Sequence, residues 1–364
     1  MPFHPAPTPR TPWIVMSIYV LVTLVLAWAV TLPLVVQSPA ERADAPLELH
    51  QNLFLLSPLV GAVIAWFVER RQPLAVLHGV TTPPRDASEG RDSDAAGHAG
   101  DAGDAGDAGD AGDAGEEVSQ NGVAAPLRRQ HLADALGLTP LRPVSRLISW
   151  CVLALLLFLA LTLAALGVGA LLGVYPLDLS MPLFTQDLAR RLGEQDGGQF
   201  LASGLLVEVG VIVVSAIATM PLHATAEMGW RGWFFPRLQR RLGPTAAVLA
   251  TGVLTGVWHT PLLAAGFHYT NTPLPLAVLL MCGYCVVIGG LLAWMRMRSG
   301  SIWPAAFAQS MITAATILHF WFASADPQFD YRAATLQGWS GWIIPGMLLG
   351  ILLLVRRRAF VPAD

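Results

Sequence analysis

Long apolar runs separated by short polar segments dominate this chain of 364 residues. A transmembrane helix needs roughly 20 mainly apolar residues. Eight runs meet this requirement or come close to it, and they cover residues 12–36, 51–68, 147–174, 201–222, 245–265, 275–295, 301–322 and 339–355. The second and eighth runs are short and the third is long, which leaves seven or nine spans open. The pattern predicts an all-α, polytopic membrane helix bundle of about eight transmembrane helices.

Arginine residues fall mainly on one side of the predicted bundle. All 22 basic residues are arginine, and with the N-terminus inside, the segments predicted to be cytoplasmic hold all but Arg42, Arg190, Arg191 and Arg332. Because basic residues accumulate in cytoplasmic segments, both termini are expected in the cytoplasm. The arginine-only usage is compatible with a GC-rich bacterial genome, so we expect a bacterial cytoplasmic (inner) membrane.

The composition supports a membrane protein. Apolar residues make up 54% and charged residues 13% of the chain, and the mean hydropathy is +0.53. This balance lies outside the range of soluble domains and gives no support to nucleic-acid binding. The three cysteines, Cys151, Cys282 and Cys285, lie within apolar runs, where we interpret them as packing residues rather than as a redox or metal motif.

One polar insert divides the chain into three regions. Residues 1–83 hold the first two predicted spans, residues 84–126 form the insert, and residues 127–364 hold the other six spans. The insert carries five tandem Asp-Ala-Gly triplets at 101–115. Such a tract has almost nothing to bury, so it is predicted to be a disordered cytoplasmic linker. Calcium binding is the alternative, but the repeat lacks the spaced ligands and the bidentate acid of a calcium loop.

Ionisable residues within predicted spans are costly and by default indicate a functional site. His223, Glu227 and Arg231 follow one another at intervals of four, so they share one face of a helix. A salt bridge that snorkels at the membrane boundary would explain this stripe equally well. The predicted spans also hold three further groups of this kind: Glu208, which has no assigned role, His259 and His319.

Two more polar segments lie in neighbouring spans. The fifth span contains Trp258-His259-Thr260-Pro261. The seventh span opens with Ser299-Gly300-Ser301-Ile302-Trp303-Pro304 and continues to Gln309 and Thr313, which again lie four residues apart. Three neighbouring spans therefore each carry polar groups, and we expect these groups to meet in the interior of the bundle.

Together these segments resemble the CPBP family of intramembrane metalloproteases, which includes the type II CAAX prenyl proteases and the bacteriocin-immunity or abortive-infection proteins. The resemblance covers about residues 201–322. The first family motif has two glutamates, three residues and an arginine, and here it reads Ala226-Glu227-x-x-x-Arg231. The second motif supplies a histidine, which is His259 here. The third, a histidine followed after three residues by asparagine, becomes Gln309-x-x-x-Thr313.

The resemblance implies a membrane endopeptidase with a degenerate site. In the family, the first glutamate and the second-motif histidine activate a water molecule. Ala226 has no proton-accepting group, and Gln309 can donate a hydrogen bond but cannot serve as an acid, a base or a useful zinc ligand. Because general base catalysis contributes about 10²–10⁴-fold in rate, we expect weak or lost activity. The candidate catalytic residues are Glu227 and His259, in a site with Arg231, Gln309 and Thr313.

Two alternatives remain open. An active metalloprotease would use a shifted centre in which His223, Glu227 and His259 bind zinc. A transporter or a membrane binding protein is the other alternative, supported by Glu208 and by the prolines that interrupt the spans. In every case the partners implied are the lipid bilayer and a membrane-associated protein or peptide, with no nucleic acid.

Overall fold

The computed structural model describes residues 11–38, 41, 45–71, 131–192, 201–325, 329–354 and 357–360. The predicted linker at 84–126 lies outside these residues. The described residues form a helical bundle without strands, apart from one isolated bridge between Leu177 and Ala323. An all-α membrane bundle is therefore confirmed.

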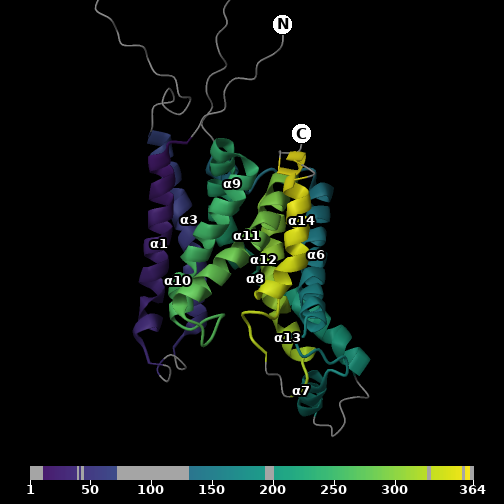
Figure 1. Ribbon diagram of the computed structural model, residues 1–364. Coiled ribbons are helices and arrows are strands. Elements are labelled where there is room, and N and C mark those ends of the chain that lie inside the picture. The colour runs from purple at the N-terminus through teal and green to yellow at the C-terminus, as the bar shows by residue number, and fades with distance from the viewer. Residues whose placement is uncertain are drawn as a thin grey trace, which may run out of the picture.

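Long apolar helices make up the bundle, and short helices connect them (Figure 1). The long helices lie within or close to the predicted spans. They are α1 (Trp13–Val36), α3 (Leu47–Arg71), α6 (Val144–Leu171), α8 (Leu201–Glu227), α9 (Phe235–Trp258), α11 (Leu274–Ser299), α12 (Trp303–Ala314) and α14 (Ile343–Leu354). The short helical elements are α5 (Leu132–Ala135), α7 (Pro182–Leu192), η2 (Met228–Phe234), α10 (Thr260–Ala264), η3 (Ala315–Ile317), α13 (Leu318–Trp321), η4 (Trp339–Trp342) and η5 (Arg357–Phe360).

Among the residues that the structure describes, five helical stretches are long and apolar enough to cross a membrane. One of them, Leu201–Ala264, is a 64-residue run that contains α8, η2, α9 and α10. Two predicted spans fall on the 12-residue helices α12 and α14, which are too short to meet the length requirement alone. The count of eight spans therefore stays a prediction. Large apolar side chains such as Leu206 (76% exposed) and Val214 (65% exposed) face outward along α8, as expected of a surface that contacts lipid.

Helix α9 packs closely along α11, and two glycines permit this approach. A Cβ atom added at Gly252 would lie 2.5 Å from the Val286 Cα, and one added at Gly256 would lie 2.5 Å from the Cys282 Cα. Small residues four positions apart allow helix backbones to approach in membranes. The Gly252-x-x-x-Gly256 pair therefore sets how the end of α9, with His259 beside it, lies against α11.

Charged contacts gather at one end of the bundle, which we call the arginine-rich end. Arg237 at the start of α9 pairs with Glu69 at the end of α3, 2.9 Å apart. Arg241 donates to the Thr11 carbonyl just before α1, and Arg146 at the start of α6 donates to the Arg298 carbonyl. In Figure 1, α7 and α13 lie at the opposite end of the bundle.

Candidate functional site

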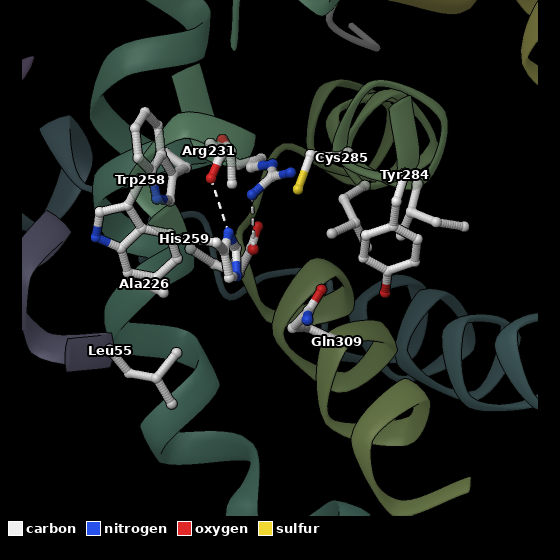
Figure 2. A pocket seen from close by; sticks show the side chains of 14 residues that line it. Leu55, Ala226, Arg231, Trp258, His259, Tyr284, Cys285 and Gln309 are labelled. Carbon is white, nitrogen blue, oxygen red and sulfur yellow. Dashed lines mark hydrogen bonds and ion pairs between the residues drawn. The ribbon is translucent and has the colours of Figure 1, made fainter. Parts of the chain in front are cut away.

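A small cavity of about 60 Å³ lies between α3, α8, α9, α11 and α12, and we call it the central cavity. Figure 2 shows the side chains of Arg231, His259, Cys285 and Gln309 around it. Its volume suffices for a few water molecules but not for a peptide. The polar and sulfur-containing side chains of its lining are Glu227, Arg231, Thr255, His259, Tyr284, Cys285 and Gln309.

The residues that connect α8 to α9 form a π-helix, η2, of seven residues. Wide turns of this kind are frequent at functional sites. Two glycines let η2 pack against neighbouring backbone. A Cβ atom at Gly229 would collide with the Pro58 carbonyl oxygen, and one at Gly232 would collide with the Leu136 carbonyl oxygen. The Gly-Trp-Arg-Gly segment therefore fixes the backbone that carries Arg231.

Glu227 and Arg231 form a buried ion pair beside the central cavity. Arg231 Nη1 donates to Glu227 Oε1 over 3.0 Å, and the two side chains are 2% and 5% exposed. Gly289 on α11 makes room for the guanidinium, because a Cβ atom there would lie 2.5 Å from Arg231 Nη2. Among the described residues, Glu227 Oε2 and Arg231 Nε have no hydrogen-bond partner. Both groups therefore retain bonding capacity for water or a ligand.

His259 follows the last residue of α9 and is held in one tautomer. Its Nδ1 lies 2.8 Å from the Thr255 carbonyl oxygen, which can only accept a hydrogen bond, so Nδ1 carries the proton of the neutral ring. Nε2 is then left with a lone pair. Phe54 and Trp258 pack against the ring, with centroid distances of 5.7 and 4.7 Å. This arrangement presents a positioned imidazole nitrogen that can accept a proton.

The substituted motif residues divide between two levels of the bundle. Ala226 and Gln309 line the central cavity with His259. Thr313 lies one turn further along α12 and bonds to His223, with 3.0 Å between Thr313 Oγ1 and His223 Nε2. His223 Nδ1 also lies 3.1 Å from the Thr219 carbonyl oxygen. His223 and Thr313 therefore join α8 to α12 and are absent from the cavity lining.

The donor set does not fit a zinc ion. In the ranges that the structure describes, no three His, Cys, Asp or Glu side chains gather closely enough to hold a metal ion. The sequence hypothesis placed His223 beside Glu227 and His259, but the structure does not bring these three together. His223 instead bonds to Thr313 of α12, and it is absent from the cavity lining that contains Glu227 and His259.

Glu208 has a partner at the opposite end of α8. Arg191 of α7 lies 2.6 Å from Glu208 Oε1 and also 2.6 Å from Asp187. The carboxylate that appeared isolated in the sequence thus ties the connecting helix α7 to α8. His319, also singled out in the sequence, lies near Tyr331, away from the central cavity.

Comparison with known proteins agrees with this arrangement. Residues 203–315 match the family described as type II CAAX prenyl endopeptidase Rce1-like. This match supports the resemblance of the segment to the CPBP/CAAX protease family. It runs from α8 to the start of η3 and includes Glu227, Arg231, His259 and Gln309. No curated protein and no solved structure matches the chain.

Several residues of the CAAX-protease-like site were not predicted from the sequence. Tyr284 and Cys285 line the cavity from α11, and Leu55 lines it from α3. The Cys282-x-x-Cys285 spacing drew attention to this stretch of α11, but only as a packing feature. The π-helix left no trace in the hydropathy pattern, because its residues continue the apolar and aromatic run.

Proposed function

We propose that this chain is a membrane protein of the CAAX protease type that binds a membrane-associated peptide or protein and has weak or no endopeptidase activity. One observation supports the proposal above the others. Ala226, at the position of the first glutamate of the family motif, lines the central cavity together with His259. A methyl group therefore stands where the resemblance implies the general base.

The chemistry of the remaining groups supports weak activity. Peptide hydrolysis needs a base for water and donors for the oxyanion. His259 can accept a proton, and the amide of Gln309 can donate to an oxyanion. Glu227, however, directs one carboxylate oxygen to Arg231. Loss of a general base costs about 10²–10⁴-fold in rate, whereas binding through the remaining groups does not require one.

Orientation and location form part of the proposal. We place the arginine-rich end and both termini in the cytoplasm, and the bundle in the inner membrane of a bacterium. The contacts of Arg237 and Arg241 with residues of α3 and the segment before α1 support one common basic end. The segment 84–126 is proposed as a cytoplasmic linker.

Peptide cleavage by the purified full-length chain tests the proposal, with prenylated and other membrane-associated peptides as probes. We expect the natural chain to cleave at background and Ala226→Glu to raise the rate by about 10²–10⁴-fold. His259→Ala in the Ala226→Glu chain is the matched control and should return the rate to background. The proposed loss of activity would be refuted if the natural chain cleaved the peptides and if Glu227→Ala and His259→Ala each abolished that cleavage.

A second candidate, an active peptidase without the first glutamate, rests on a separate observation. Within the described part of the chain, Glu227 Oε2 has no hydrogen-bond partner and lies in the lining that also contains His259. A water molecule between these groups would have a carboxylate and an imidazole as neighbours. Metal analysis separates this candidate from the shifted zinc centre, since only the latter predicts bound metal that His223→Ala removes.

Transport gains no support from Glu208. That hypothesis relied on an unexplained carboxylate within a span, and the ion pair with Arg191 gives this carboxylate a structural role.

A further inference from the structure

A second cavity of about 220 Å³ lies towards the end of the bundle opposite the arginine-rich end. Its lining comes from α6, from the loop 265–273 between α10 and α11, from the α12–α13 region and from the segment before α14. Figure 1 shows α10 and α13 at this end. The polar residues of the lining include His268, Thr316, His319, Tyr331, Thr335 and Gln337.

The polar groups of the second cavity are neutral hydrogen-bonding groups. Gln337 Nε2 lies 3.1 Å from His268 Nδ1, so the amide donates and the imidazole accepts. Tyr331 Oη lies 3.3 Å from His319 Nε2. Burial raises the pKa of Tyr331, so the phenol stays protonated and donates to this nitrogen. Within the described part of the chain, no Asp, Glu or Arg side chain lines the cavity. Such a lining suits water and small uncharged polar molecules.

The backbone at the second cavity is held in an unusual conformation. His268 has φ +68° and Thr335 has φ +68°, and both line the cavity. A left-handed backbone is unfavourable for a residue other than glycine. Such residues concentrate at functional sites, where the surrounding structure maintains them. The hydrogen bond between Gln337 and His268 links the two strained segments.

His268 also lies beside His259, a residue that lines the central cavity. Its ring centroid lies 6.3 Å from that of His259, and the rings are inclined by 75°. His268 is an exposed residue, whereas His259 is partly buried and lines the central cavity. Among the described residues the two cavities share no lining residue, and this pair of rings brings the lining of one next to the lining of the other. Towards the arginine-rich end, the central cavity is backed by Trp230 (1% exposed) and Arg231 (4% exposed).

We infer that the second cavity is the route by which water and small uncharged polar molecules reach His259, with His268 as the residue that separates the two cavities. Access then comes from the end opposite the arginine-rich end. This role of His268 is one of access, and it holds whether or not the central cavity hydrolyses peptides.

Cys285 provides a reporter inside the central cavity. Hydrogen peroxide is a small, uncharged probe: the thiolate form of the cysteine attacks one peroxide oxygen, which forms the sulfenic acid and releases hydroxide. The test uses the full-length chain in detergent, with Cys151→Ser and Cys282→Ala so that Cys285 is the only thiol. Mass spectrometry of the denatured product measures the oxidation rate.

His268→Trp in this single-cysteine chain is expected to slow oxidation at least about tenfold, because peroxide must then wait for local opening of the bundle. His268→Ala should accelerate oxidation, and it keeps the test decisive if the tryptophan variant does not fold. Thr270→Trp is the matched control, since Thr270 is exposed in the same loop and lines neither cavity. It should leave the rate unchanged.

Two results would overturn the inference. In the first, His268→Trp and His268→Ala both oxidise at the rate of the single-cysteine parent. In the second, Thr270→Trp slows oxidation as much as His268→Trp does. Neither result bears on peptide cleavage, so failure here is distinct from failure of the proposed function.

Discussion

Two glutamate–arginine pairs lie at opposite ends of α8, and they differ in their surroundings more than in their geometry. The Arg191–Glu208 pair has the shorter distance, 2.6 Å, but its side chains are 58% and 16% exposed. The Glu227–Arg231 pair spans 3.0 Å, with side chains 2% and 5% exposed. Burial makes the second pair costly to break, because the remaining charge would have no partner. Distance alone therefore does not rank the two pairs.

The largest effect is expected from breaking the buried pair. Arg231→Ala leaves the Glu227 carboxylate buried without its cation, and should lower the free energy of unfolding by about 3–5 kcal/mol. Denaturant unfolding of the purified chain in detergent measures this loss. The double variant Glu227→Gln/Arg231→Met removes both charges and should recover part of the stability. If Arg231→Ala lowered the free energy of unfolding by less than about 1 kcal/mol, the Glu227–Arg231 pair would contribute no more than a surface ion pair. That result would contradict the contrast drawn between the two pairs.

A smaller effect is expected from crowding the same guanidinium. The Cβ atom of Gly289→Ala would lie 2.5 Å from Arg231 Nη2, so the side chain must shift. We expect a loss of about 1–3 kcal/mol in the free energy of unfolding, as for other overpacked sites.

Gly167→Ala in α6 is the matched control for Gly289→Ala. An added Cβ atom there meets nothing within 4 Å. Replacing glycine by alanine inside a helix stabilises by about 0.5–1 kcal/mol, so this variant should be neutral or more stable. Equal effects at the two positions would show that Gly289 does not act through Arg231.

The smallest effect is expected at the exposed pair. Glu208→Gln removes the charge that meets Arg191, and should change the free energy of unfolding by no more than about 1 kcal/mol. Added salt should reduce even this difference, because exposed charges are screened. A loss comparable to that of Arg231→Ala would contradict the contrast between the two ends of α8.

The sequence predicted the all-α fold class and, within the site, the pairing of Glu227 with Arg231. Four-residue spacing placed Glu227 and Arg231 on one face, and the structure contains their ion pair. The same rule also placed His223 on that face, but His223 contacts Thr313 one turn away from the cavity. Spacing gives the angle around a helix, and it cannot tell which turn meets a neighbouring helix.

Glu208 shows a second limit. An ionisable residue in an apolar run indicated a functional site, yet its partner Arg191 belongs to α7, a separate short helix. Nothing in the local pattern of either segment reveals that they meet, because the contact depends on how the connector folds back onto α8.

The sequence by itself determined the apolar helices, the spacing of Glu227 and Arg231, and the presence of alanine at position 226, since these depend on residue type and helical period. The tertiary structure alone decided that Ala226, His259 and Gln309 line one cavity and that His268, which lines a second, lies beside His259. It also decided that His223 joins α8 to α12. How far one helix is shifted along its axis relative to its neighbour depends on interhelical packing, such as the approach of α9 to α11 at Gly252 and Gly256. That packing is a property of the whole bundle.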